Sequence, residues 1–269
     1  MTVGAAMAPA DLEAHGPAAA APLLEARGLS AMRAGDQGPV AVLDGVDFAL
    51  PAGALVEVSG PSGAGKTTLL LALARLLPGA TGALLLGGLP AEEIPSSVWR
   101  TQVALLPQRA ALVPGTLAEN LRLPWTLKVR HAERPPADEA LFGALEDVGL
   151  GALSLDRDVA RLSVGQLARV ALVRVMLTRP RVLLLDEPDA SLDDASAAEV
   201  ARVTSVFVAD GGSVVRVSHV RSDARASVRY RLEGGKLSAA PALTPVPASA
   251  FEAGQRVAPA LAAPEVPHA

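Results

Sequence analysis

A phosphate-binding loop is indicated by eight consecutive residues, Gly60-Pro61-Ser62-Gly63-Ala64-Gly65-Lys66-Thr67. They follow a strand-like run, Leu55 to Val58, and precede a helix-like pattern that begins at Thr68. Glycines let backbone N–H groups curl around phosphate oxygens, and the helix N-terminus adds its dipole. Lys66 can then reach the β and γ phosphates, and the Thr67 hydroxyl can bind Mg²⁺. We predict nucleotide binding by Gly60, Pro61, Ser62, Gly63, Ala64, Gly65, Lys66, Thr67 and Thr68.

Two adjacent carboxylates, Asp186 and Glu187, end a second apolar run that starts at Val182. Ligands of open α/β sheets bind at the C-terminal edge of the strands, so this pair is predicted to face the phosphates. We predict that Asp186 holds the magnesium shell and that Glu187 polarises a water for in-line attack on the γ-phosphate. The alternative is a strand that simply ends in Asp-Glu-Pro.

Such motifs need a buried sheet with crossover helices to position them. Between residues 116 and 176 the chain reads mainly as helix, with one Pro-rich break at 134–136, which predicts a helical insertion. We therefore predict an α/β fold. Short apolar runs that are followed by helical patterns predict strands at Ala54–Ser59, Val103–Leu106, Val182–Leu185 and Ser213–Ser218.

Composition excludes several classes of protein. Half of the 269 residues are hydrophobic, which is enough for a sizeable core, but only 3% are aromatic, which argues against base stacking on single-stranded nucleic acid. A net charge of -4 gives no attraction to a polyanion, and the lack of cysteine excludes disulfides, thiolate metal sites and thiol nucleophiles. We find no apolar stretch of about 20 residues and no signal peptide, so a cytoplasmic protein is expected.

Three further features narrow the class. Gln108 follows one predicted strand, Leu162-Ser163-Val164-Gly165-Gln166 precedes a helix-like pattern, and His219 follows another strand. A lone histidine after an apolar strand is more often structural, and Gln108 alone is a weak signal. In order along the chain, however, these motifs and the segment Ser191-Leu192-Asp193 resemble those of the ATP-binding cassette (ABC) ATPases. The resemblance spans roughly residues 23–236.

This resemblance implies a phosphate-loop NTPase of the ABC ATPase type, with a mixed sheet core and a helical subdomain between the glutamine loop and the signature motif. It implies ATP and Mg²⁺ as ligands. It also implies an ATP-hydrolysing transporter subunit that powers a separate membrane permease, through which the chain attaches to the inner face of the cell membrane. Nucleic acid is not an expected partner.

The resemblance also implies a role for each motif residue. Ser163, Gly165 and Gln166 would bind the γ-phosphate of ATP held by a second copy of the chain, and Asp193 would lie at that dimer interface. ATP closes the dimer, and hydrolysis reopens it. The implied catalytic residues are Lys66, Gln108, Glu187 and His219. The implied metal ligands are Thr67, Gln108 and Asp186.

Two departures from the family pattern stand out. Val164 occupies a signature position that is usually glycine, so one close backbone approach to the phosphate is hindered. The family also places an aromatic side chain on adenine, but residues 29–35 contain none. Either Met32 or the Arg33 guanidinium is left to cover the base.

Two Ala/Pro-rich tails, at residues 1–22 and 239–269, are predicted to be disordered. Between them we predict one ATPase domain at residues 23–238, with its helical subdomain at about 109–176.

The run from Gly115 to Trp125 and the loop Ala34-Gly35-Asp36 resemble small bacterial ATPases assigned to iron export (the YbbL/FetA type). The helical region after Gln108 is expected to form the groove for a permease coupling helix, with Trp125 lining it.

Alternatives to an iron-export motor stay open. The chain could serve another exporter or an importer, or it could be an ATP-binding regulatory or assembly module with weak hydrolysis. A phosphate-loop kinase or GTPase is disfavoured, because the guanine-selecting Asn-Lys-x-Asp pattern is absent from the sequence. The transported substrate cannot be read from these motifs.

Overall fold

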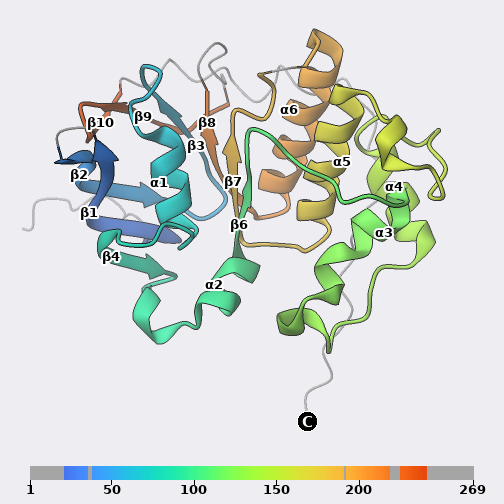
Figure 1. The fold of residues 1–269 in the computed structure, drawn as a ribbon, viewed down its shortest axis with the longest axis horizontal. Coiled ribbons are helices and arrows are strands. Elements are labelled where there is room, and N and C mark those ends of the chain that lie inside the picture. The colour runs from blue at the N-terminus through green and yellow to red at the C-terminus, as the bar shows by residue number, and fades with distance from the viewer. Residues whose placement is uncertain (1–20, 36–37, 191, 219–224, 241–269) are drawn as a thin grey trace, which may run out of the picture.

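The computed structural model describes residues 21–35, 38–190, 192–218 and 225–240 (Figure 1). Within these ranges the strands form two sheets, and the smaller is antiparallel in the order β2-β1-β4-β5. The long hairpin β1–β2 makes up most of it, and Gly35 pairs with Gly38 at the tip. The bounds of its strands are Leu24–Gly35 (β1), Gly38–Leu50 (β2), Thr81–Leu86 (β4) and Leu89–Pro90 (β5).

The larger sheet has the order β10-β9-β3-β8-β7-β6 and is parallel except for β10. Its central strands are nearly continuous apolar runs, because both faces of a parallel sheet are covered. All five residues of β7 are buried, for example. The bounds are Leu55–Ser59 (β3), Val103–Leu106 (β6), Val182–Asp186 (β7), Ser213–Val217 (β8), Val228–Glu233 (β9) and Lys236–Ala239 (β10).

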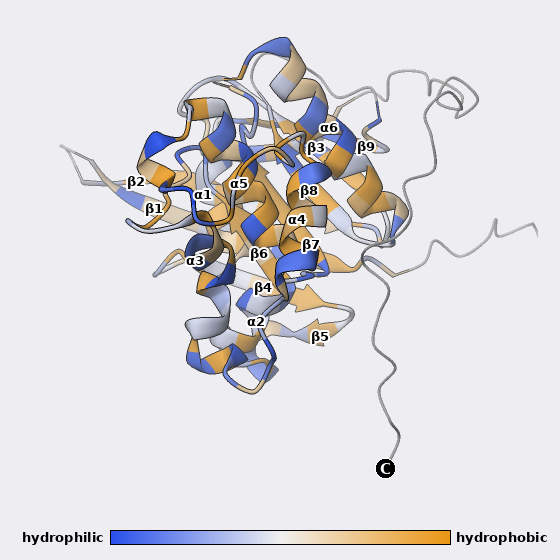
Figure 2. Cartoon of the chain, turned by 90° about the vertical axis from the view of Figure 1, so that its right-hand side faces the viewer, coloured by the Kyte–Doolittle hydropathy of each residue, from blue (hydrophilic) through white to orange (hydrophobic). Residues whose placement is uncertain are grey.

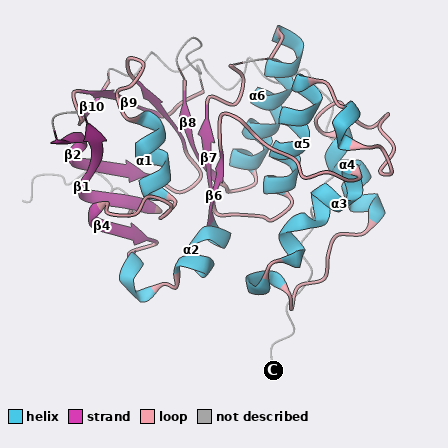
Figure 3. Cartoon of the chain, viewed as in Figure 1, coloured by secondary structure: helices cyan, strands magenta, loops and turns pink. Residues whose placement is uncertain are grey.

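The helices gather mainly on the side away from the antiparallel sheet (Figure 3). None of those in the described ranges combines the length and the apolar character that crossing a bilayer demands. Short 3-10 turns extend α3 through residues 123–126 and 128–130. The bounds of the α-helices are Lys66–Leu73 (α1), Ser96–Gln102 (α2), Leu117–Arg122 (α3), Asp138–Glu146 (α4), Val164–Met176 (α5) and Asp194–Ala209 (α6).

Two apolar cores lie on opposite faces of the larger sheet. Because side chains alternate along a strand, Val56 packs with Leu69 of α1 in one core, whereas Leu183 packs in the other with Val170 of α5 and Val200 of α6. Figure 2 shows the hydrophobic colouring concentrated on the central strands and on the helix faces turned toward them. The helix that begins in the phosphate loop is thus separated by the sheet from the helix that begins in the signature segment.

The predicted α/β fold class is confirmed, and each predicted strand is present within one residue of its expected ends. Two expectations were incomplete or wrong. The antiparallel sheet was not predicted. The helical insertion was expected to have a single break, at residues 134–136, but it has a second one at residues 147–158. Gly149 explains it, because its φ of 67° is unsuited to a continuing helix, and α4 ends at Glu146.

Candidate nucleotide-binding site

The loop between β3 and α1 depends on two glycines. Gly60 has a φ of 152°, and a Cβ there would lie 2.1 Å from the carbonyl oxygen of Leu232. Gly65 has a φ of 100°, and a Cβ there would lie 2.7 Å from Cγ1 of Val42 on β2. Gly65 is also the N-cap of α1 and offers no side-chain acceptor, so the first-turn N–H groups of the helix stay directed at the loop. At both positions neighbouring atoms lie so close to the loop backbone that a side chain would clash with them.

Lys66 curls back over this loop. Its Nζ donates to the carbonyl oxygens of Gly60 at 2.9 Å and of Pro61 at 3.0 Å, and the residue is 5% exposed. Burial lowers the pKa of the Lys66 ammonium, while the charges of Glu187 and Asp186 act in the opposite direction. A partly desolvated cation interacts more strongly with a phosphate than a fully hydrated one does.

The predicted carboxylates lie at the same end of the sheet as the loop. Thr67 Oγ1 donates to Oδ2 of the buried Asp186 at 2.8 Å. Because β6 and β7 are parallel neighbours, Gln108 lies beside Glu187, and its Nε2 donates to Oε2 of Glu187 at 2.7 Å. Glu187 has a φ of 48°, which is uncommon for a residue with a side chain and requires surroundings that hold it.

These groups are suited to a hard cation. A hydroxyl and a carboxylate are oxygen donors of the kind that Mg²⁺ prefers, and Mg²⁺ in such sites is usually completed by substrate phosphates and water. In the described ranges no group of three or more His, Cys, Asp or Glu side chains could hold a metal by itself. The donors therefore fit Mg²⁺ bound together with a nucleotide, rather than a metal cage made of protein alone.

The signature residues form a second group, away from the loop. Ser163 caps α5: its Oγ accepts from Gln166 N at 3.2 Å, and Gln166 Oε1 accepts from Ser163 N at 3.0 Å. Val164 follows and is 67% exposed. Gly165 packs close to Ser196 of α6, because a Cβ at Gly165 would lie 3.4 Å from Ser196 Oγ. This end of α5 is thus fixed by its own capping box and by α6.

Asp193 belongs to this second group as the N-cap of α6. Its Oδ1 accepts from Ser196 N at 2.7 Å, and this hydrogen bond, more than the nearby Arg169, lowers the pKa of the Asp193 carboxyl. The structure therefore brings together Lys66, Thr67, Gln108, Asp186 and Glu187, and separately brings Ser163, Gly165 and Gln166 near Asp193. His219 and Ser191 lie outside the described residues.

One ion pair beside this site was missed by sequence reasoning. Arg216 of β8 and Asp189 of the turn after β7 approach to 2.7 Å, with side chains 6% and 10% exposed. The available signal was an arginine in the middle of the apolar run Val214–Val217. A charged residue in a central strand needs a partner, and that partner could not be identified without the fold.

The fold and the loop define a phosphate-loop nucleotide-binding protein, and comparisons with known proteins refine this class. A model of the family described as ABC transporter matches residues 43–190. The "Hemin import ATP-binding protein HmuV" of Nocardia farcinica is 40% identical over 201 residues, covering 73% of this chain and 68% of HmuV. The chain therefore belongs to the ABC transporter family, and it is an ATP-binding, ATP-hydrolysing member.

Other relatives span different transport systems. "Probable iron export ATP-binding protein FetA" of Escherichia coli is 32% identical over 188 residues, covering 69% of this chain and 81% of FetA. "Protein STAR1" of Oryza sativa subsp. japonica is 37% identical over 203 residues, covering 75% of this chain but only 57% of STAR1. The dimeric ATP-binding cassette MJ0796, solved with ADP and Pi, has a TM-score of 0.70 and 21% identity, and covers 80% of this chain and 96% of its own. The predicted family is confirmed, and FetA is among the chain's relatives.

Proposed function

We propose that this chain is the ATP-hydrolysing motor of a transporter whose membrane permease is a separate polypeptide. The observation that carries the proposal is the separation of its two groups of site residues. Lys66 and Glu187 lie at one end of the sheet with the phosphate loop, whereas Ser163 begins a helix on the face opposite α1. A site that needs both groups is completed when a second copy presents its signature segment to the nucleotide.

In this proposal the phosphates of ATP lie in the loop at residues 60–68. Lys66 exchanges its carbonyl partners for the β and γ phosphate oxygens, and the N-terminus of α1 adds N–H donors. Thr67, Asp186 and Gln108 would hold Mg²⁺, which supplies charge neutralisation for the phosphates when bound. Met32, which is 59% exposed on the β1–β2 hairpin, or its neighbour Arg33 would cover adenine.

Glu187 is proposed to accept a proton from the attacking water. The hydrogen bond from Gln108 fixes one of its carboxylate oxygens, and the hydrogen bond from Glu187 N to Val217 O, 3.2 Å long, fixes its backbone on β8. The water is proposed to approach this fixed carboxylate. His219 is proposed to contact the γ-phosphate.

The dimer role of the signature segment yields a prediction. Ser163→Arg should leave the ATP affinity of the single chain within about twofold of wild type, because the chain's own nucleotide is held by Lys66 and its loop. Hydrolysis should fall about 10²-fold, since the partner's γ-phosphate loses its donors. Equilibrium titration with ATP and steady-state assays measure the two effects. Ser238→Arg, on exposed β10, is the control. A loss of affinity as large as that of Lys66→Ala would contradict the division of roles.

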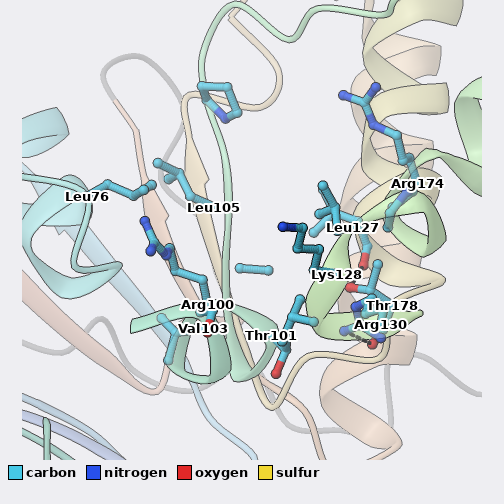
Figure 4. Close-up of a pocket in the computed structure, with 16 residues that line it drawn as sticks. Leu76, Arg100, Thr101, Val103, Leu105, Leu127, Lys128, Arg130, Arg174 and Thr178 are labelled. Carbon is cyan, nitrogen blue, oxygen red and sulfur yellow. Dashed lines mark hydrogen bonds between the residues drawn. The ribbon is translucent and has the colours of Figure 1, made fainter. Parts of the chain in front are cut away.

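The permease is proposed to dock in a groove of about 650 Å³, lined by 16 residues, that lies between α2 with β6 and the segment 123–130 with α5 (Figure 4). Leu105 and Leu127 give the groove apolar walls. None of its lining residues, all within the described ranges, is acidic. Trp125, which was expected in this lining, is not part of it, and its ring centroid lies 5.9 Å from Cζ of the lining residue Arg130. The basic lining residues are Arg100, Lys128, Arg130 and Arg174.

Most of these cations lack a carboxylate partner in the described part of the chain. Arg100 Nε donates to Ser96 O at 2.9 Å, and Arg174 Nη2 donates to Ala111 O at 2.8 Å. Burial lowers the pKa of the Arg174 guanidinium, and no carboxylate contributes to offset it. The chemistry that complements this groove is a short segment with one apolar face and acidic side chains, which we propose the permease supplies.

Reversing the charge of the groove should weaken docking on an acidic segment. In cells that express the tagged chain, Arg100→Glu with Lys128→Glu should reduce the membrane-bound fraction by about tenfold or more, because attraction to an acidic segment becomes repulsion. The ATPase rate of the purified chain should stay within about twofold. Lys236→Glu, an exposed lysine on β10, is the matched control. Docking on a permease would be contradicted if the groove variant and Lys236→Glu lost the same membrane-bound fraction. It would also be contradicted if wild type bound protein-free anionic vesicles as well as it binds cell membranes.

Iron export remains a proposal about the cargo, supported by the similarity to FetA. The similarity to HmuV supports the alternative of an importer. Metal and haem transport assays in vesicles that hold the chain with its permease would distinguish them. The proposed location is the inner face of the cell membrane. The proposed ATPase domain comprises residues 23–238, and its helical subdomain comprises about residues 109–176.

A further inference from the structure

A row of buried charges crosses the larger sheet beneath the Glu187 turn. On β3, Glu57 pairs in register with Arg229 of β9 on one side and with Arg216 of β8 on the other, so the three side chains share one face. Arg229 Nε and Glu57 Oε2 approach to 3.2 Å, and Arg216 Nη2 and Asp189 Oδ2 to 2.7 Å. All four side chains are at most 10% exposed. Charged residues thus replace the aliphatic ones that otherwise fill this core.

Stability alone does not account for the pair at Arg216 and Asp189. Removing two charges from water is costly, and well-packed apolar residues in place of a buried ion pair are often as stable or more stable. Arg216 stands in β8, whose other residues are Ser213, Val214, Val215 and Val217. An aliphatic residue there would continue the apolar strand without the desolvation cost of a buried guanidinium. What the ion pair adds is a directional link between β8 and the turn that carries Asp189.

That turn is the one that presents Glu187. Glu187 N donates to Val217 O at 3.2 Å, Ala190 N donates to Glu187 O at 3.2 Å, and the ion pair fixes Asp189 to the residue that precedes Val217. Two successive residues of β8 therefore hold the turn, one by its backbone and one by its side chain. Because Glu187 has a left-handed φ of 48°, the turn needs such external support to keep this conformation.

We propose that the ion pair between Arg216 and Asp189 positions the Glu187 carboxylate for hydrolysis. The pair acts without touching the nucleotide or the attacking water, by fixing the turn two residues beyond Glu187. The inference rests on the proposed role of Glu187. A displacement of about 1 Å at such a carboxylate is enough to slow catalysis by about 10²-fold, while phosphate binding by the loop at residues 60–68 is unaffected.

The test compares substitutions at the two ends of the charge row in the purified full chain. Asp189→Asn and Arg216→Met should each lower kcat for ATP hydrolysis by about 10- to 100-fold, while KM and the equilibrium affinity for ATP stay within about twofold. Arg216→Lys should recover part of kcat. Arg229→Met, which breaks the equally buried pair at the far end, should keep kcat within about twofold even where its thermal midpoint falls. The double variant Asp189→Asn with Arg216→Met removes both charges of this ion pair, so it should be thermally more stable than Arg216→Met alone but should not regain kcat.

Two results would overturn the inference. The first is a kcat of Asp189→Asn within twofold of wild type. The second is that Arg229→Met loses as much kcat and as much thermal midpoint as Arg216→Met does. Glu187→Gln is assayed in parallel to separate this failure from that of the proposed function. If wild type hydrolyses ATP and Glu187→Gln does not, a normal Asp189→Asn rejects only the positioning role. If Glu187→Gln hydrolyses ATP as fast as wild type, the role of Glu187 itself is rejected and the inference falls with it.

Discussion

Replacing Glu187 by Gln should reduce steady-state ATP hydrolysis by roughly 10²- to 10⁴-fold, the usual contribution of a positioned general base. The substitution keeps the size of the side chain and an oxygen that can accept the 2.7 Å hydrogen bond from Gln108 Nε2. It removes the group that takes the proton from the attacking water. ATP should therefore still bind, with an affinity within about twofold of wild type, and accumulate unhydrolysed. Phosphate release under saturating MgATP measures the loss.

The control for Glu187→Gln is Glu133→Gln, an exposed carboxylate in the helical insertion that is paired with Arg130. Its ATPase rate should match that of wild type. If wild type and Glu187→Gln instead show the same low rate, the chain is an ATP-binding regulatory module. The 67% exposed Val164, in place of the usual signature glycine, would then be the first feature to revert, as Val164→Gly.

Lys66→Ala should weaken ATP binding by about 10²- to 10⁴-fold. The ammonium can donate to both the β and the γ phosphate, and a hydrogen bond involving charged groups contributes about 1.5–3 kcal/mol. The partial burial that lowers the pKa of Lys66 also increases the effect, since its interaction with phosphate is less screened than at the surface. Equilibrium titration of the purified chain with a fluorescent ATP analogue measures the affinity.

Lys236→Ala, at a lysine whose side chain is 64% exposed, is the matched control for Lys66→Ala. It should bind ATP as wild type does. Circular dichroism of both variants should show an unchanged helix content, because the hydrogen bonds from Lys66 Nζ to Gly60 O and Pro61 O lie in the loop and not within a helix. Undiminished ATP affinity in Lys66→Ala would reject the role of the loop.

The parts of the fold that are encoded locally could be predicted from the sequence. The strand at Val182–Asp186 is a short apolar run that ends in carboxylates, and the loop at residues 60–67 is specified by glycines whose φ angles few other residues adopt. That Gln108 and Glu187 each follow a strand, and so lie at the same edge of the sheet, was also predictable, whereas their direct contact depends on the pairing of β6 with β7. Each of these features depends on residues close together in sequence or on one general rule about sheet edges.

Features that depend on distant residues could not be predicted in this way. The hairpin of β1 and β2 has no tight-turn signal that separates it from a loop, and its register contains shifts near Leu29 and Ala31. The partner of Arg216 is 27 residues away along the chain and becomes apparent only when β7 and β8 pair. Likewise, the basic groove forms where α2 lies beside the segment 123–130, and the sequence of either segment by itself does not indicate a groove.

The separation of the two groups of site residues is tested most directly by the mass of the Glu187→Gln chain in sedimentation velocity, with and without MgATP. We expect a monomer without nucleotide and a dimer with it, because ATP bound at the loop of one copy is retained and joins the Ser163 segment of the other. The same variant that also carries Ser163→Arg should stay monomeric in both conditions. A Glu187→Gln chain that binds ATP and remains a monomer would contradict the shared site.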